Sequence, residues 1–425
     1  MFDPRSRSRA IRHRVHAGRR GVLVMAVVVI TAGCSASVND DLVGTPTPDP
    51  LRAQVVGSSS PVGSPTLATP LARVRTSLDR GDLPGAAAAA ATAVALAPDD
   101  PDALAARAEV RFRSGDLDGA RGDLNRAVNR SPRRADLLIR RARVEVALGE
   151  MDAALADDGA AIARDPGLIE AFIHRATVRA LIAQGMPSAY QAALDDANRA
   201  LALDPESWSA RIALARVYLA RAAFRGDPAD LGHALVELEK VRGGSGGPTA
   251  ALIGAQLLAI RGDVEGAHSQ RDDALEGVPL PGPRAPAIAD IAFTDATIAF
   301  AEHDWERAAA SAKEALIADP ERWDARVLLA ESLLGAKDDP AALGAADLIR
   351  DRWPEHGVGW YLRGVALTRL GDSPAARVAL ERARALLAAS PVYLARIGQA
   401  ERDLPGGTGG KPQPVTSPKW RCRLR

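Results

Sequence analysis

A short phrase recurs through this chain at a fixed interval. A Gly-Asp or Gly-Glu pair is followed five residues later by Ala and, in the first three copies, twelve residues further on by Pro. These three copies lie 34 residues apart in a chain of 425 residues. A period of this length predicts a repeat architecture, because each unit cannot bury its apolar face alone and must stack on its neighbours. The copies are Gly81-Asp82…Ala86…Pro98, Gly115-Asp116…Ala120…Pro132, Gly149-Glu150…Ala154…Pro166 and Gly371-Asp372…Ala376.

Between about residues 69 and 388, these repeats resemble the tetratricopeptide family. The resemblance rests on small residues at position 8 of a first helix A and position 20 of a second helix B, with proline closing many units. Position 8 holds Ala108, Ala142, Ala176, Ala215, Ala255, Ala296, Ala330 and Gly364. Position 20 holds Ala86, Ala120, Ala154, Ala193, Ala234, Ala267, Ala308, Ala342 and Ala376. The resemblance implies an all-α, right-handed superhelical solenoid of about nine helix–turn–helix units across residues 69–403.

The spacing is longer than the repeat in three places, at residues 184–188, 226–228 and 280–286. We expect these insertions to be loops on one continuous solenoid. The alternative is a hinge near residues 243–248 or 280–287 that divides the array into two.

Oppositely charged residues recur at facing positions of the second to fourth units. Position 7 of helix A is arginine and position 23 of helix B is aspartate. Because a bidentate arginine offsets much of the desolvation of a carboxylate, this pattern predicts three ion pairs inside the hairpins. The predicted pairs are Arg107 with Asp123, Arg141 with Asp157, and Arg175 with Asp196.

One further helix follows the ninth unit. Residues 391–402 carry Val392, Leu394 and Ile397 at helical spacing, which predicts a cap over the last repeat, as the end of a solenoid requires. Residues 404–425 are predicted to form a flexible basic tail. This tail is either a disordered end or a basic–aromatic segment, with Trp420, that contacts anionic lipid or a partner.

The first 33 residues resemble a bacterial lipoprotein signal. Seven arginines precede an apolar run from Gly21 to Ala32, which is shorter than the roughly 20 apolar residues of a membrane-spanning helix. The run ends in Thr31-Ala32-Gly33-Cys34, similar to a lipobox, in which the cysteine is acylated after the signal is cut. The alternatives are an ordinary signal peptide or an uncleaved anchor, and Arg19-Arg20 also resembles a twin-arginine signal.

This resemblance implies export and anchoring to the extracytoplasmic face of a bacterial membrane through lipidated Cys34. Residues 34–68 are rich in Ser, Thr, Pro and Gly, which predicts a disordered tether.

Few features of the sequence indicate a catalytic, metal-binding or phosphate-binding site. The net charge of +1 gives no field that favours nucleic acid, and the two cysteines, Cys34 and Cys422, are too few for a four-cysteine zinc site. Gly243 to Gly247 lacks the Lys-Ser/Thr of a phosphate-binding loop and is interpreted as a linker. We therefore expect a protein that is not an enzyme and has no metal, cofactor or small-molecule substrate.

The family resemblance places helix A of each unit on the concave surface, where positions 2, 5, 9, 12 and 13 tend to meet a ligand. The candidate protein-binding residues are Glu109, Phe112, Arg113, Arg143, Thr177, Arg216, Phe293, Thr297, Phe300, Glu331 and Tyr361. They predict a scaffold that binds a segment of an envelope protein during assembly or localisation of a complex. The alternative is binding of an envelope polymer, polysaccharide or peptidoglycan, on tryptophan surfaces. Those tryptophans would be Trp208, Trp305, Trp323, Trp353 and Trp360.

Overall fold

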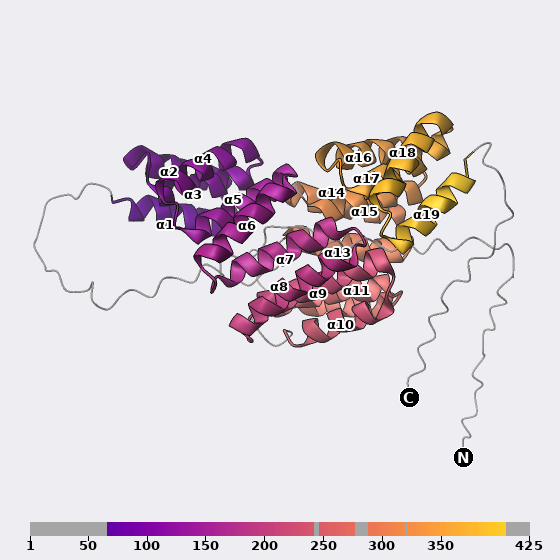
Figure 1. The fold of residues 1–425 in the computed structure, drawn as a ribbon, viewed down its shortest axis with the longest axis horizontal. Helices are drawn as coiled ribbons and strands as arrows, with labels where there is room; N and C mark the ends of the chain where they lie inside the picture. Colours follow the sequence, from indigo (N-terminus) through magenta and orange to yellow (C-terminus); the bar gives the residue numbers. More distant parts are fainter. Residues whose placement is uncertain (1–65, 242–245, 277–287, 320–321, 405–425) are drawn as a thin grey trace, which may run out of the picture.

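The computed structural model describes residues 66–241, 246–276, 288–319 and 322–404, which form nineteen α-helices and no strand (Figure 1). Helices α1 to α18 pair in order as nine antiparallel hairpins, and α19 follows the ninth. The predicted signal, Cys34, nearly all of the tether, Cys422 and the tail after Leu404 lie outside the described residues.

The helices are α1 (Ala68–Asp79), α2 (Leu83–Leu96), α3 (Pro101–Arg113), α4 (Leu117–Arg130), α5 (Ala135–Leu148), α6 (Met151–Arg164), α7 (Ile169–Ala183), α8 (Pro187–Leu203), α9 (Trp208–Arg225), α10 (Pro228–Glu239), α11 (Gly247–Ile260), α12 (Val264–Leu275), α13 (Ile288–Ala301), α14 (Trp305–Ala318), α15 (Trp323–Gly335), α16 (Asp339–Arg352), α17 (Gly357–Leu370), α18 (Ser373–Leu386) and α19 (Pro391–Arg402).

The recurring Gly-Asp phrase, Gly-Glu in the third hairpin, forms the turn inside most of the hairpins. Gly115 has a φ of +82°, in the left-handed region that glycine enters at little cost. Asp116 then caps the second helix, since its carboxylate accepts a hydrogen bond of 3.0 Å from the backbone N–H of Gly119. In the seventh hairpin His303 takes the left-handed position, with a φ of +62°, and Asp304 is the cap. The repeat phrase is therefore a turn followed by a helix start.

Alanine at the repeat positions lets the helices approach closely. Ala108 and Ala142 on the first helices, and Ala120 and Ala154 on the second, are at most 1% exposed. A larger side chain there would separate the two helices of a hairpin, because the packed interior has no spare volume. Small residues at these positions thus set the helix–helix distance of the whole array.

The helices on both sides of each possible hinge, near residues 243–248 and 280–287, share one core. One apolar core joins α9, α10 and α11 to α13, α14 and α15, with Leu238, Leu257, Phe293 and Leu328 all buried in it. The described helices therefore form a single solenoid, as expected, although parts of both linkers lie outside the described residues.

The solenoid curves until its C-terminal repeats meet its middle repeats (Figure 1). At the turn between α7 and α8, the Gln184 side chain donates to the carbonyl of Glu355 (3.1 Å) and accepts from the N–H of Gly357 (2.8 Å). At the end of α9, the carbonyl of Phe224 accepts a 2.6 Å hydrogen bond from the hydroxyl of Ser390. A shared apolar core extends from α7, α8 and α9 into α15 to α19. The C-terminal repeats consequently pack against the turns inside the fourth and fifth hairpins.

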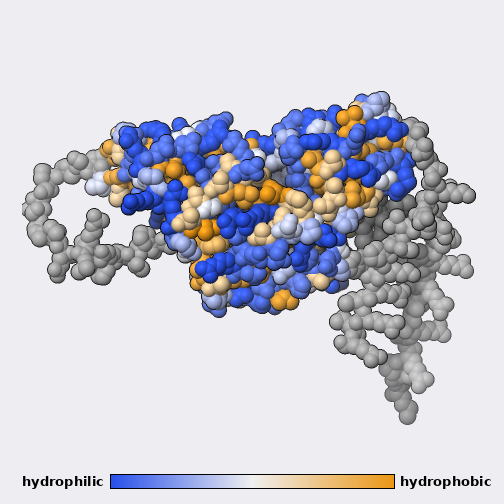
Figure 2. Space-filling view, viewed as in Figure 1, coloured by the Kyte–Doolittle hydropathy of each residue, from blue (hydrophilic) through white to orange (hydrophobic). Residues whose placement is uncertain are grey.

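Figure 2 shows apolar residues gathered in the middle of this face, between the N-terminal and C-terminal helices, and polar residues over most of the rest. Among the described helices, none combines the length and the apolar character needed to cross a bilayer.

Candidate functional site

The structure contains the three ion pairs predicted inside the hairpins, each as a bidentate contact. Arg107 donates to Asp123 at 2.7 and 2.6 Å. The corresponding distances are 2.6 and 2.7 Å from Arg141 to Asp157 and 2.8 and 2.7 Å from Arg175 to Asp196. The aspartate side chains are at most 10% exposed and the arginine side chains 19–25%, so water reaches one side of each pair. These residues link helix A to helix B and have a structural role.

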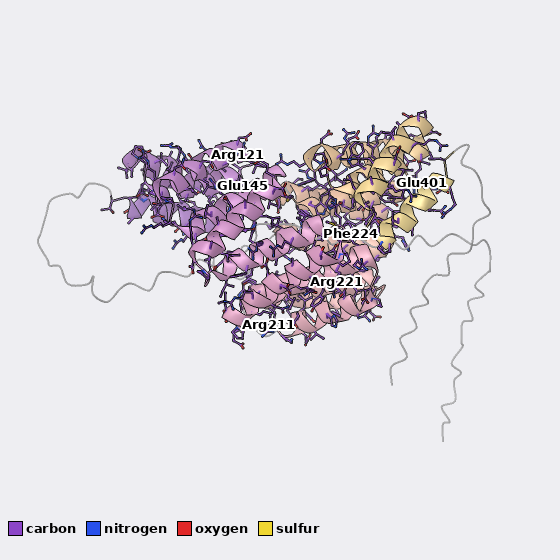
Figure 3. The ribbon with its side chains drawn as sticks, in the orientation of Figure 1. Arg121, Glu145, Arg211, Arg221, Phe224 and Glu401 are labelled. Carbon is purple, nitrogen blue, oxygen red and sulfur yellow. The ribbon has the colours of Figure 1, made fainter. Side chains whose placement is uncertain are left out.

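The same site differs in the third hairpin. In the second and fourth hairpins a further arginine, Arg111 or Arg179, also contacts the aspartate, at 2.7 and 2.6 Å. The equivalent residue of the third hairpin is Glu145, which is 7% exposed (labelled in Figure 3). Burial and the neighbouring Asp157 raise the pKa of Glu145 to about 7, although Arg141 lowers it. The third hairpin therefore has a carboxyl group with a pKa near neutral pH at the position where the second and fourth hairpins have an arginine.

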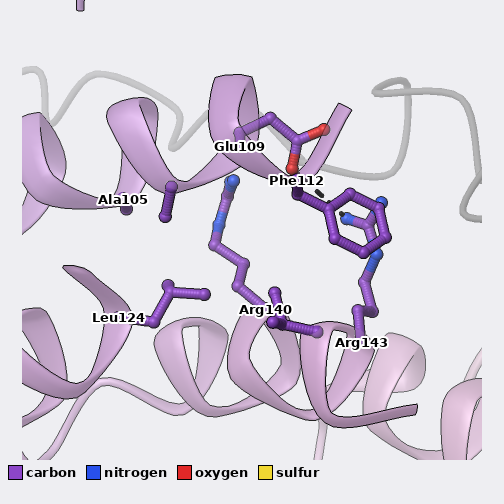
Figure 4. Close-up of a pocket in the computed structure, with 8 residues that line it drawn as sticks. Ala105, Glu109, Phe112, Leu124, Arg140 and Arg143 are labelled. Atoms are coloured by element: carbon purple, nitrogen blue, oxygen red, sulfur yellow. Dashed lines mark ion pairs between the residues drawn. The ribbon is translucent and has the colours of Figure 1, made fainter. Parts of the chain in front are cut away.

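Four of the candidate protein-binding residues meet on the concave surface of α3 and α5. The two helices and α4 border a shallow hollow that is open to solvent (Figure 4). Phe112 lies under the guanidinium of Arg143, 5.6 Å from the ring centre, and Glu109 contacts Arg113 at 2.7 Å and Arg143 at 3.8 Å. The hollow is lined by Ala105, Ala108, Glu109, Phe112, Leu124, Arg140, Arg143 and Val144.

Positive charge dominates this hollow. Burial by itself raises the pKa of Glu109, but Arg143, Arg113 and Arg140 together outweigh burial and lower that pKa to about 2. Glu109 is therefore ionised throughout the physiological range and neutralises only part of the surrounding charge. An aromatic ring beside partly neutralised arginines is suited to contact with a polypeptide that carries apolar and acidic groups.

Four other candidate residues lie in the packed core. Phe293 is fully buried, and Phe300 is 4% exposed and packs edge-on to Trp305 at 5.0 Å. Thr177 and Thr297 are buried, and each hydroxyl donates to the carbonyl four residues earlier, at 2.9 and 2.8 Å. The helices around these four side chains already contact them. Arg216 is half-buried on α9.

The remaining two candidates contact a helix that belongs to the chain itself. Glu331 on α15 accepts a 3.2 Å hydrogen bond from Arg396 of α19. The ring of Tyr361 on α17 lies 5.5 Å from that of Tyr393, also on α19. The predicted capping helix therefore does more than cover α18, because it also fills the concave surface between α9, α15 and α17.

Sequence reasoning missed Arg140 and Arg396. Arg140 is at position 6 of its unit, one residue outside the positions considered, so a wider pattern would have found it. Arg396 lies outside the repeats, and no periodic signal relates it to Glu331, 65 residues away. Contacts between distant units cannot be read from a repeat pattern.

The tryptophans do not form open stacking surfaces in the described part of the chain. Trp323 and Trp353 are 2% and 7% exposed and pack edge to face, with ring centres 5.3 Å apart. Trp208, Trp305 and Trp360 are half-buried. Across the described ranges, no three His, Cys, Asp or Glu side chains are arranged to hold a metal ion.

Comparison with known proteins agrees with the helical repeats. Residues 71–135, 106–169 and 293–357 match the family described as tetratricopeptide repeat. No match to a curated protein sequence was found.

The chain is similar to several solved structures, and this similarity does not indicate a function. A tetratricopeptide repeat protein from Parabacteroides merdae is 18% identical, with a TM-score of 0.45, over 63% of this chain and 98% of that one. A thermophilic protein of this kind from Thermus thermophilus is 23% identical, with a TM-score of 0.37, over 42% and 91%. PilW, a type IV pilus biogenesis factor, is 18% identical, with a TM-score of 0.39, over 50% and 94%.

Proposed function

Because this chain is built from tetratricopeptide repeats, we propose that it is a scaffold that binds a segment of a partner protein on the concave surface of its N-terminal repeats. The hollow between α3 and α5 carries the proposal. It combines an aromatic ring, arginines and access to solvent on α3 and α5, which are first helices of their hairpins. Binding of an extended or helical peptide needs such a surface and no catalytic group.

Site-specific photo-cross-linking in cells tests this proposal. A photoreactive amino acid in place of Phe112 would face the hollow, and one in place of Thr92, exposed on the second helix of the first hairpin, would face outward. We expect one dominant protein to be captured from position 112 and not from position 92. Equal capture from both positions, or from neither, would contradict binding at this surface.

We also propose that the scaffold is exported, lipid-anchored through Cys34, and serves assembly or localisation of an envelope complex. The arginine-rich segment, the short apolar run and the cysteine at its end support this part. Fractionation of cells that express the wild type or Cys34→Ser tests it. The wild type should carry acyl chains in mass spectra and remain with membranes, and the variant should carry none and leave them. A membrane-bound Cys34→Ser chain with its first 33 residues intact would instead indicate an uncleaved anchor.

Envelope polymer binding receives less support. Stacking on a sugar requires an exposed aromatic face, and the five tryptophans within the described residues are buried or half-buried. The rings of Trp208 and Trp305 lie so close to Gly246 and Gly335 that a Cβ there would be 2.5 Å from each ring. Those faces are closed by backbone.

A further inference from the structure

The second and fourth hairpins each hold a guanidinium group between the same two acceptors. In the second hairpin, Nη1 of Arg111 donates to Oδ2 of Asp123 at 2.7 Å and to the carbonyl of Gly119 at 3.1 Å. In the fourth, Nη1 of Arg179 donates to Oδ2 of Asp196 at 2.6 Å and to the carbonyl four residues before that aspartate at 3.2 Å. An aspartate and the carbonyl four residues earlier therefore form a guanidinium-binding arrangement that the repeat builds twice.

The third hairpin keeps both acceptors and changes the donor. The aspartate is Asp157, the carbonyl belongs to Ala153, and the residue at the arginine position is Glu145 (labelled in Figure 3). Oδ2 of Asp157 accepts from Nε of Arg141 at 2.6 Å, and no second guanidinium among the described residues contacts it. Its side chain is 10% exposed, against 3% and 6% for the two neighbouring aspartates, because a second arginine does not cover it.

Glu145 adds a further acceptor that is not satisfied. Its Oε1 lies 3.7 Å from Nε of Arg141, and its side chain is 9% exposed. Its buried Oε2 has no hydrogen-bond partner within the part of the chain that the structure describes. A buried carboxylate oxygen without a donor is unfavourable, so a donor that reaches it is bound favourably. Two carboxylates, Glu145 and Asp157, thus share the single cation Arg141.

This position is reached from solvent and does not belong to the hollow between α3 and α5. The side chains of Arg111 and Arg179, which fill it in the neighbouring hairpins, are 34% and 30% exposed. Arg141 also donates to Asn125 at 3.0 Å, and Asn125 is an exposed residue of α4, the second helix of the preceding hairpin. A ligand that paired with Glu145 and Asp157 would therefore lie beside the second helices.

We propose that Glu145, Asp157 and the carbonyl of Ala153 bind the guanidinium group of an arginine from another polypeptide. This group takes the place that Arg111 and Arg179 hold in the neighbouring hairpins, and rotation of the Glu145 side chain brings Oε2 to it. A planar guanidinium fits two carboxylates better than an ammonium group does, because it donates several N–H groups in fixed directions. Three acceptors bind a small molecule only weakly, whereas a polypeptide adds contacts around its arginine. This site does not depend on the function proposed for the hollow.

Saturation-transfer NMR, which detects weak binding, tests this site with the full-length chain at pH 8. The probe is N-acetyl-arginine amide, and its matched control is N-acetyl-citrulline amide, which has the same shape without the charge. We expect the citrulline probe to bind at least about tenfold more weakly, because a charged donor forms the stronger hydrogen bonds with a carboxylate.

Variants then locate the binding. Glu145→Arg restores the residue of the neighbouring hairpins, so it should fold and should bind the arginine probe at least about tenfold more weakly than the wild type. Glu145→Gln, which changes the side chain least, should also weaken binding. Asp152→Asn removes an exposed carboxylate from the same hairpin and should bind the probe as the wild type does.

Four results would overturn the proposal. Two are equal binding of the arginine probe to the wild type and to Glu145→Arg, and no saturation transfer from the wild type to the probe. The third is displacement of the probe by an equal concentration of calcium ions, which would assign the site to a metal. The fourth is free L-arginine that binds at least about tenfold more tightly than the amide, which would make the free amino acid the ligand.

Discussion

The packing of the C-terminal repeats against the turn between α5 and α6 can be tested with a matched pair of glycines. Gly115 and Gly149 occupy the same position in consecutive repeats, and both have a φ of +82°. A Cβ at Gly115 would meet no heavy atom within 4 Å. A Cβ at Gly149 would lie 2.7 Å from the carbonyl oxygen of Arg352, a backbone atom at the end of α16.

The two alanine variants should therefore differ in stability. Each imposes a left-handed conformation on a residue with a Cβ, at a cost of about 1–2 kcal/mol. Gly149→Ala adds an overlap with backbone that cannot rotate away, and such overpacking costs about 1–3 kcal/mol more. The turn can relieve the overlap only by moving from α16, which would also break the hydrogen bond from the Arg352 guanidinium to the carbonyl of Ala147.

Hydrogen exchange resolved along the chain measures this difference, because repeat arrays do not always unfold in a single step. Gly149→Ala should lower protection in the turn between α5 and α6 and also in residues 352–357, some 200 residues away. Gly115→Ala should lower protection only near its own turn. If both variants lose the same stability and neither affects residues 352–357, the solenoid does not close as described.

Three further predictions concern the buried charges. Asp123→Ala should destabilise the chain by about 3 kcal/mol in urea unfolding, because it removes the carboxylate that pairs with two partly buried arginines, Arg107 and Arg111. Asp99→Ala, in an exposed pair, should cost less than about 1 kcal/mol, and equal losses would contradict the burial argument. Since the pKa of Glu145 is raised to about 7, its contribution to stability is present at pH 4 and is lost as the pH rises through 7. Glu145→Gln should then unfold at higher urea than the wild type at pH 8, by up to about 3 kcal/mol, and match it at pH 4. Burial lowers the pKa of His356 to about 3, so its contribution is lost as the pH falls from about 6.5 toward 3, and His356→Gln should show less acid destabilisation, by up to about 5 kcal/mol; unchanged acid sensitivity would place this ring in water.

The 34-residue period was sufficient to predict the hairpins, their turns and their internal ion pairs. All of these are contacts between helices that are adjacent in the sequence, such as Arg107 with Asp123, only 16 residues apart. A repeat carries this information because one unit and its neighbour determine it. The candidate residues on α3 and α5 belong to the same category, since two successive helices A bring them together.

The contacts between distant repeats were decided only by the tertiary structure. Small rotations between units, together with the longer loops, add up over nine hairpins until Gln184 meets Gly357 and Phe224 meets Ser390. Those contacts join residues more than 160 positions apart, so no local pattern records them. The sequence alone determined what each unit is, because its stabilising contacts are local. Which inner surface stays open, and which is filled by α19, depends on the sum of all the units.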